Sequence, residues 1–293
     1  MPFARLFAFA VTFGAICALA PTAGAYIPQS QSIVGRVAHN HGKGGYIIEQ
    51  EVQFRTSSDP LVLRERWLVE NGERMRLSVS APAASAAKPS EPIRYEALYH
   101  DGKRLLTDVA GGTVIKASPV SPEFIEGFFH DRTSKSFINA LIRSRIVPPS
   151  FVHERPRVTK IEQIRHFPEP QVRLGRTAGV IAWIFGEPSP VEGKANPEAW
   201  IEQDSFVLRR LRFPSDAEIA ADRISAYPNG LKFPRERTVT WDNNSVTIRV
   251  VSIKAAANAQ LNKALEPNAF ASASKPARLP DVAQVREFYS RFR

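Results

Sequence analysis

Two histidines one residue apart, His39 and His41, have a spacing that could serve a metal ion. On a β-strand, side chains two residues apart lie on the same face, so both imidazoles would reach one ligand position. Two nitrogen ligands alone leave a zinc site incomplete, and the sequence places no carboxylate beside them. We therefore interpret residues 26–45, a polar segment rich in glycine, as a flexible loop, and we predict no metal site and no cofactor.

The sequence lacks the motifs of common hydrolases and nucleotide-binding enzymes. It contains no Gly-x-Ser-x-Gly, no His-Glu-x-x-His and no glycine-rich phosphate loop. Serine, histidine and aspartate are too common for a catalytic triad to be inferred without geometry. We therefore predict that the protein is not an enzyme. A hydrolase, the less favoured alternative, would need a histidine, a nucleophile and a carboxylate that converge in a pocket.

The first 25 residues have the pattern of a secretory signal. Arg5 precedes an apolar run over 6–19, and the small residues Ala23-Gly24-Ala25 precede a cleavage point at Tyr26. A membrane anchor would need about 20 apolar residues, a length this run does not reach. We therefore expect a cleavable signal peptide, residues 1–25, and a periplasmic location. Cys17, the only cysteine, would leave with the signal, so the mature protein would have no thiol for a disulfide or a zinc site.

The net charge of +10 favours anionic partners. For an exported protein these are membrane surfaces and acidic polymers, and we expect no nucleic acid partner. The alternative, that basic residues only cover the solvent faces of strands, stays open.

Strands joined by tight turns dominate residues 46–255. In 46–55, apolar side chains alternate with polar ones, which is typical of a strand with one buried face. Asn71-Gly72, Asp101-Gly102 and Asp242-Asn243-Asn244 each separate two predicted strands, and these residue types tolerate the positive φ of hairpin turns. We therefore predict one domain, residues 26–255, built on an antiparallel sheet.

The principal helical segment lies within residues 120–147. Phe124, Phe128, Phe129 and Leu141 recur at helical spacing around a break near residue 131. We predict two short amphipathic helices, or one kinked helix, whose apolar stripe packs on the sheet. The stripe is either ordinary core or a lid over a cavity, and the sequence leaves both interpretations open.

Residues 180–185 predict a strand that is apolar on both faces, with Trp183 and Phe185 on one of them. In an antiparallel sheet such a strand needs a cover on each side. Helices would cover one face, and either a ligand or a second loop would cover the other.

Residues 256–293 form the C-terminal extension. Its low complexity predicts partial disorder, and 280–292 predict a final short helix. We expect this basic end to be a solvated tail rather than a membrane contact.

Five short segments in the second half of the chain follow a recognisable order. They are Trp200-Ile201-Glu202, Leu208-Arg209-Arg210-Leu211, Tyr227-Pro228-Asn229-Gly230, Phe233-Pro234-Arg235 and Val246-Thr247-Ile248-Arg249-Val250. This order resembles the C-terminal half of the LolA/LolB-like superfamily, which includes periplasmic carriers of outer-membrane lipoproteins. The resemblance implies an α+β fold: an open antiparallel half β-barrel covered by short helices, with an apolar concave side that holds acyl chains. It also implies a lid-closing arginine, for which Arg55, Arg64 and Arg66 are candidates and none can be selected.

The leading hypothesis is an exported soluble binding protein that shelters a lipid, a lipoprotein acyl chain or another apolar ligand, and that acts as a monomer. Such binding needs only an apolar pocket, since each sheltered methylene contributes about 0.8 kcal/mol. The alternative is a periplasmic sensor or interaction module of the same superfamily, which would show an exposed apolar patch outside the cavity. The side chains predicted to line the cavity are Trp67, Met75, Phe124, Phe128, Phe129, Leu141, Trp183, Phe185, Trp200, Phe206 and Leu208.

Overall fold

The computed structural model of the chain describes residues 28–55, 60–81, 93–107, 115–152, 172–273 and 277–293. The predicted signal peptide, residues 1–25, lies outside the described residues. No described helix has the length and apolar character needed to cross a membrane.

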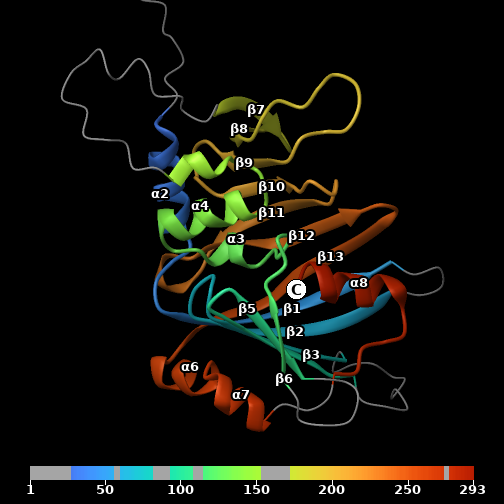
Figure 1. The fold of residues 1–293 in the computed structure, drawn as a ribbon. Helices are drawn as coiled ribbons and strands as arrows, with labels where there is room; N and C mark the ends of the chain where they lie inside the picture. The colour runs from blue at the N-terminus through green and yellow to red at the C-terminus, as the bar shows by residue number, and fades with distance from the viewer. Residues whose placement is uncertain (1–27, 56–59, 82–92, 108–114, 153–171, 274–276) are drawn as a thin grey trace, which may run out of the picture.

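Thirteen antiparallel strands form one sheet in the order β6-β5-β4-β3-β2-β1-β13-β12-β11-β10-β9-β8-β7 (Figure 1). The chain thus builds two meanders, and pairing between β1 and β13 joins them. The strands β6 and β7 form the two outer edges, so the sheet is open, as predicted. The bounds are β1 (Gly45–Phe54), β2 (Leu61–Val69), β3 (Met75–Ser80), β4 (Tyr95–His100), β5 (Lys103–Thr107), β6 (Ile115–Pro119), β7 (Arg173–Thr177), β8 (Val180–Phe185), β9 (Glu198–Glu202), β10 (Leu208–Arg212), β11 (Glu218–Ala226), β12 (Lys232–Trp241) and β13 (Asn244–Ala256).

The predicted turn residues produce the hairpins. Between β4 and β5, Asp101 and Gly102 have φ values of 49° and 72°, the left-handed geometry that a two-residue hairpin requires. Between β2 and β3, the Oδ1 atom of Asn71 accepts hydrogen bonds of 2.9 Å from the backbone N–H groups of Glu73 and Arg74. Asp242 has a φ of 46° between β12 and β13. All three predicted hairpins are confirmed.

The sheet curves around the segment that precedes and includes α3 (Gly127–His130). Phe124 stacks on Tyr99 of β4 at 4.4 Å between ring centroids, whereas Phe128 lies 6.1 Å from Phe213, which follows β10. Because β4 and β10 are far apart in the strand order, a flat sheet could not place both beside one short segment. The face turned toward α3 is therefore the concave face.

Two short helices separated by a break occupy the predicted helical segment. These are α3 and α4 (Ser134–Arg143), and Thr133 caps α4 by accepting a 3.0 Å hydrogen bond from the backbone N–H of Ser136. Phe137 and Leu141 of α4 are completely buried on the sheet. A short 3₁₀ helix, Pro149–Val152, follows.

The predicted loop over 26–45 is wrong for most of its length, because Ser30–Asn40 form the helix α2. Ile33, Val34 and Val37 lie on one side of this helix and are fully buried. Three apolar residues at i, i+1 and i+4 are enough to dock a short helix that packs against α4. Packing therefore outweighs the polar composition of the segment.

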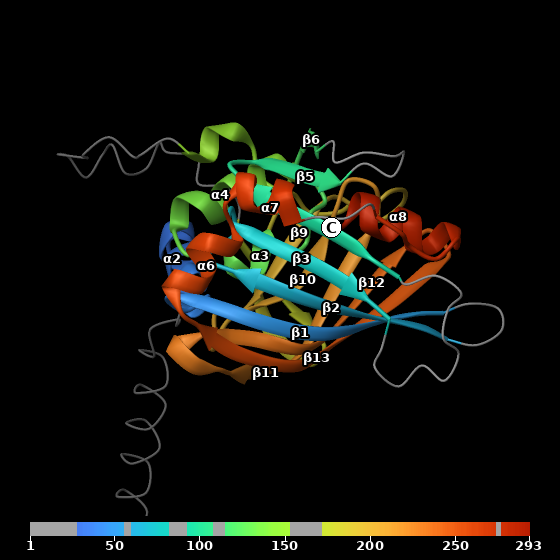
Figure 2. The ribbon, with the colours of Figure 1, turned by 90° about the horizontal axis from the view of Figure 1, so that it is seen from below.

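The C-terminal segment contacts both faces of the sheet. The helices α6 (Asn258–Ala264) and α7 (Pro267–Ala273) pack on Leu68 and Leu98, which face away from the concave side, while α8 (Ala283–Arg291) packs on the concave face. In Figure 2, α6 and α7 lie near one end of β1 to β3 and α8 toward the other. The final helix is confirmed, but the solvated tail is not: Arg293, at its end, is 0% exposed.

Candidate functional site

Three polar residues occupy inward-facing positions on the concave face. Gln50 on β1 and Glu65 on β2 each lie between buried apolar residues two positions before and after, and Arg237 on β12 lies two positions before the buried Val239. None of the three is more than 1% exposed. A buried charge is stable only when it is paired and hydrogen-bonded, so these strands must bring their polar groups together.

A network of buried charges forms where these residues meet α3 and α8. Arg293 binds Glu65 through two contacts, Nε to Oε1 at 3.0 Å and Nη2 to Oε2 at 3.1 Å, which is the bidentate arrangement that guanidinium groups favour. Glu126, just before α3, lies between the two arginines, with its Oε1 atom 2.9 Å from Nη1 of Arg237 and 3.4 Å from Nη1 of Arg293.

Gln50 connects the two halves of this network. Its Oε1 atom accepts a 2.7 Å hydrogen bond from Nη2 of Arg237, and its Nε2 atom donates one of 2.6 Å to Glu65. The indole N–H of Trp67 donates a further 3.1 Å hydrogen bond to the same carboxylate. Two acidic and two basic side chains therefore balance within one hydrogen-bonded cluster, which we call the buried charge cluster: Gln50, Glu65, Glu126, Arg237 and Arg293.

Aromatic rings enclose both guanidinium groups. The Cζ atom of Arg237 lies 5.0 Å and 4.9 Å from the ring centroids of Phe129 and Phe233. The Cζ atom of Arg293 lies 4.7 Å from the ring of Phe288 and 5.6 Å from that of Trp67. These distances allow cation–π attraction, which strengthens when water is excluded.

Charge pairing favours the ionised forms of Glu126 and Arg293. Burial alone would favour the neutral form of Glu126, but Arg237 and Arg293 hold the pKa of this carboxyl well below its usual range. Burial would likewise lower the pKa of Arg293, but Glu65 and Glu126 raise it above the ordinary arginine value. Glu126 and Arg293 therefore stay charged near neutral pH.

A second group of buried titratable side chains lies where α2, α3 and α4 meet. Nδ1 of His41 donates a 2.6 Å hydrogen bond to the backbone oxygen of Asp131, because a carbonyl can only accept. Burial lowers the pKa of His41 to about 3 and raises that of Asp131 to about 7. Burial also lowers the pKa of His130, whose ring stacks on Phe233 at 5.3 Å. Both imidazoles are therefore neutral at pH 7.

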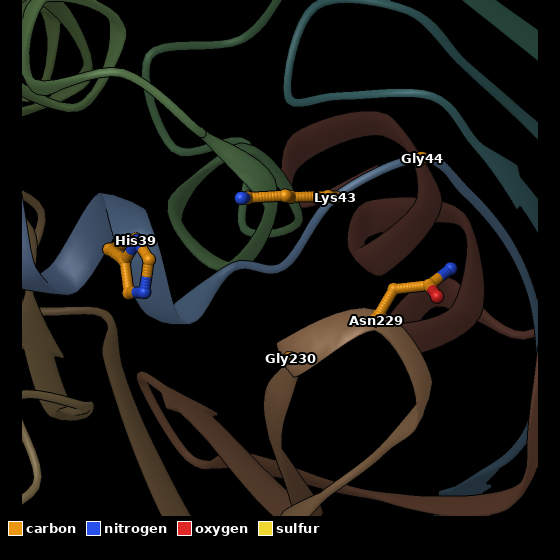
Figure 3. A pocket seen from close by; sticks show the side chains of 5 residues that line it. All are labelled: His39, Lys43, Gly44, Asn229 and Gly230. Atoms are coloured by element: carbon orange, nitrogen blue, oxygen red, sulfur yellow. The ribbon is translucent and has the colours of Figure 1, made fainter.

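The two histidines singled out by their spacing do not share a site. His39, at the end of α2, is exposed and lines an open pocket of about 560 Å³ together with Lys43, Gly44, Asn229 and Gly230 (Figure 3). His41 is buried and hydrogen-bonded. Within the described residues, no group of three or more histidine, cysteine, aspartate or glutamate side chains is arranged to hold a metal ion.

Nine of the eleven side chains predicted to line a cavity lie in one buried cluster on the concave face. Each is at most 3% exposed, and together they are Trp67, Met75, Phe124, Phe128, Phe129, Leu141, Trp183, Phe185 and Leu208. Their neighbours are side chains of the chain itself; Trp67, for example, stacks on Tyr99 at 5.7 Å. A small cavity of about 50 Å³ beside Phe124 has the volume of about one or two water molecules. Contact between these nine residues and a ligand stays a prediction.

The other two predicted residues lie elsewhere. Trp200 is on the convex face, where its indole N–H donates a 3.0 Å hydrogen bond to Glu198 and Arg210 lies 5.4 Å from its ring. On β9 the inward positions belong to Ala199 and Ile201, so Trp200 points outward by strand alternation. Phe206 is partly buried at the margin of the cluster.

None of the three candidate lid-closing arginines belongs to the buried charge cluster. Arg55 and Arg66 are exposed, and Arg64 lies 3.6 Å from Glu51 on the convex side. The buried arginines are Arg237 and Arg293, which sequence reasoning missed, as it missed Gln50, Glu65 and Glu126. For Gln50, Glu65 and Arg237 a signal was present, because a polar residue at an inward position of an alternating strand must find a buried partner.

No protein-family model matches the sequence, and no curated protein matches it. Solved structures with a similar fold include a LolA superfamily protein from Nitrosomonas europaea, with 10% identity over 83% of this chain and 99% of that chain and a TM-score of 0.49. A DUF1329 family protein from Desulfovibrio piger has 10% identity over 80% and 97% of the chains, with a TM-score of 0.47. A putative outer membrane lipoprotein-sorting protein domain from Vibrio parahaemolyticus has 11% identity over 80% and 96%, with a TM-score of 0.45. These similarities include the superfamily that the sequence resembles, and they concern the fold alone.

Proposed function

We propose that the protein is an exported, monomeric binding protein that shelters a lipid, a lipoprotein acyl chain or another apolar ligand on the concave face of its sheet. One observation carries the proposal. The apolar concave face is covered by α2, α3, α4 and α8, and none of these helices takes part in the strand pairing. A covering helix could therefore move aside while the sheet stays intact.

The free energy gained by burying a long acyl chain is comparable to that gained by burying the apolar side chains of one covering helix. A chain of 16 methylenes transferred from water gains about 13 kcal/mol, at about 0.8 kcal/mol for each methylene. The four most buried apolar side chains of the last helical segment, Val285, Phe288, Tyr289 and Phe292, contribute about 6–12 kcal/mol by the same measure. A long acyl chain can thus replace part of the cover at little net cost.

A binding role fits the chemistry of the interior better than a catalytic one. The four charged side chains of the buried charge cluster pair with one another, so none of the four is free to exchange a proton with a ligand. The alternative function, a sensor or interaction module, draws support from a different place. Leu174 and Ile181 are 39% and 44% exposed on the hairpin β7–β8, and β7 is the outermost strand among the described residues, a position at which a partner strand can pair.

Native mass spectrometry of the full-length protein, expressed with its own N-terminus and recovered from the periplasm, tests the proposal. We expect an adduct whose extracted mass identifies a lipid or acylated peptide, and a mature chain that begins at Tyr26. Protein unfolded and refolded without lipid is the control, and it should lack the adduct and take up a fluorescent fatty acid or phospholipid. Ligand-free periplasmic protein that takes up neither probe would overturn the proposal.

A further inference from the structure

The chain's own C-terminal segment fills one end of the concave face in the manner of a ligand. Phe288 makes an edge contact with Phe54 at 5.4 Å, and Phe292 makes one with Trp241 at 5.1 Å. Tyr289 lies 5.2 Å from Tyr95. The segment therefore presents an apolar, aromatic body to the sheet and places one positive side chain, that of Arg293, beside Glu65 and Glu126.

The recess that receives this charge is negative without it. Glu65 and Glu126 contribute two negative charges, and Arg237 contributes one positive charge, so the empty recess would carry a net charge of −1. Gln50 and Trp67 fix the position of the Glu65 carboxylate by hydrogen bonds, and the ring of Trp67 lies 5.6 Å from the incoming guanidinium. A fixed carboxylate pair beside an aromatic face is a receptor for a cation.

Polar contacts also hold the C-terminal segment outside this recess. Nε2 of Gln284 donates to the backbone oxygen of Ser245 at 3.2 Å, and the hydroxyl of Tyr95 donates to that of Tyr289 at 3.3 Å. Nη1 of Arg104 donates to the backbone oxygens of Tyr289 at 3.2 Å and Ser290 at 2.9 Å, and the Arg291 side chain pairs with Glu123. Arg291 is 22% exposed and Arg104 is partly exposed. Partly exposed ion pairs such as Arg291–Glu123 contribute about 0–1 kcal/mol each, so a competing ligand must mainly replace the buried aromatic side chains and the Arg293 pair.

We propose that the concave face beneath α8 is a binding site for a cationic amphiphile, an apolar chain with one guanidinium or ammonium head, and that α8 with Arg293 is the chain's own occupant of this site. Glu65 and Glu126 take the head, and Phe54, Tyr95 and Trp241 take the apolar chain. An anionic head in the same place would meet two buried carboxylates and is excluded by repulsion. The inference rests on the proposed binding function and names its ligand class.

The test measures binding of three amphiphiles with the same dodecyl chain to the full-length mature protein below their micellar concentrations. The probes are dodecylguanidinium, dodecyl sulfate and dodecyl maltoside. Calorimetry measures their affinities, and hydrogen exchange of residues 283–291 reports whether α8 is displaced. We expect dodecylguanidinium to bind about tenfold or more tightly than the other two and to speed exchange in α8. Glu65→Gln should abolish the preference. Glu218→Gln, which removes a carboxylate paired with Arg210 on the convex face, should keep it.

Arg293→Gln provides an independent measurement should Glu65→Gln not fold. Removing the resident cation while leaving both carboxylates should tighten dodecylguanidinium binding by about tenfold and leave dodecyl maltoside binding unchanged. Equal binding of all three probes would overturn the cationic ligand class and leave the proposed function standing. Binding of none would overturn both. Cation binding that leaves α8 exchange unchanged and survives Glu65→Gln would place the probe elsewhere and overturn the inference.

Discussion

The C-terminal segment makes two contacts of different kinds with the same sheet. On the convex face, α6 and α7 contribute Leu261, Leu265 and Phe270 to a small cluster with Leu68 and Leu98. On the concave face, α8 contributes large aromatic side chains together with the buried pair between Arg293 and Glu65.

The two contacts should respond differently to a substitution. In the small apolar cluster on the convex face, the loss of stability scales with the buried apolar area that the substitution removes. The concave contact combines the larger area with charges that are costly when unpaired, so the loss of one partner penalises the other. Apolar packing therefore holds α6 and α7 on the convex face. The docking of α8 on the concave face also depends on the ion pair between Arg293 and Glu65.

The largest expected effect comes from breaking that match. Glu65→Gln removes the bidentate carboxylate partner of the buried Arg293 guanidinium and leaves only the longer contact with Glu126, so we expect the free energy of unfolding to fall by about 3–5 kcal/mol. Urea denaturation measures it. In the double variant Glu65→Gln, Arg293→Gln, part of the loss should be recovered. A double variant as unstable as the sum of the two single variants would show that the pair is not coupled.

Matched phenylalanine truncations compare the two contacts directly. Phe288 and Phe270 are both 0% exposed, but Phe288 belongs to the large cluster and contacts Phe54, Trp241, Tyr289 and Phe292. We expect Phe288→Ala to cost about 5 kcal/mol and Phe270→Ala about 3 kcal/mol, because the smaller cluster can collapse around the lost volume. Thermal unfolding checks the order, and a reversed order would refute the distinction.

Two buried groups beside α3 give stability opposite responses to acid. The pKa of His41 is lowered to about 3 in the folded chain against an ordinary value of 6.5, so the unfolded chain takes up a proton first and the His41 contribution to stability decreases by about 1.4 kcal/mol per pH unit below pH 6.5. The pKa of Asp131 is raised to about 7 against an ordinary value of 3.8, so the folded chain takes up that proton first and stability gains a similar amount per pH unit below pH 7. His41→Gln removes only the first response, so between pH 6.5 and 5 its free energy of unfolding should rise by about 2 kcal/mol relative to that of the parent protein.

Hydrogen exchange at pH 5 locates the His41 effect. Amides of α2 and α4 should exchange more slowly in His41→Gln than in the parent protein at the same pH, while those of α6 and α7 differ little. Equal slowing in all four helices would mean that the whole fold, rather than the concave cover, responds to His41.

The smallest effect is expected on the convex face. Glu218 pairs with Arg210 at 2.6 Å and Arg212 at 3.2 Å, with its side chain 27% exposed. Glu218→Gln should cost less than about 1 kcal/mol and its effect should shrink in high salt, because solvent screens such pairs. A loss as large as that of Glu65→Gln would erase the contrast between the two faces.

Local signals explain which parts of the fold could be predicted. The turn pairs Asn71-Gly72 and Asp101-Gly102 set hairpins between neighbouring segments, and alternation along 46–55 assigned the faces of β1. Helix α2 was missed because only three large apolar side chains, Ile33, Val34 and Val37, form its buried stripe, and the surrounding segment is polar and contains glycine. An element could be predicted when the interactions that form it lie within about ten residues of one another in the sequence.

The buried charge cluster depended on information that one strand does not contain. Alternation alone would have placed Glu65 and Arg237 inward, but their partners come from 228 and 187 residues away, at Arg293 and Gln50. Trp200 was assigned to the cavity by its size, whereas its strand position turns it outward. Residue type indicated which side chains could be buried. Which charged side chains pair with one another depends on the tertiary structure, because the partners are far apart in the sequence.

The pairing of β1 with β13 determines the order in which the parts of the sheet can fold. It aligns Gly45 with Ala256, so the central rung of the sheet closes only after nearly the whole polypeptide is available. Each meander can form through local hairpins. The two meanders join only through the β1–β13 pairing, whose residues are far apart in the sequence, and such contacts slow folding. During that delay the apolar faces of both meanders are exposed to water, which favours aggregation until β13 has paired with β1.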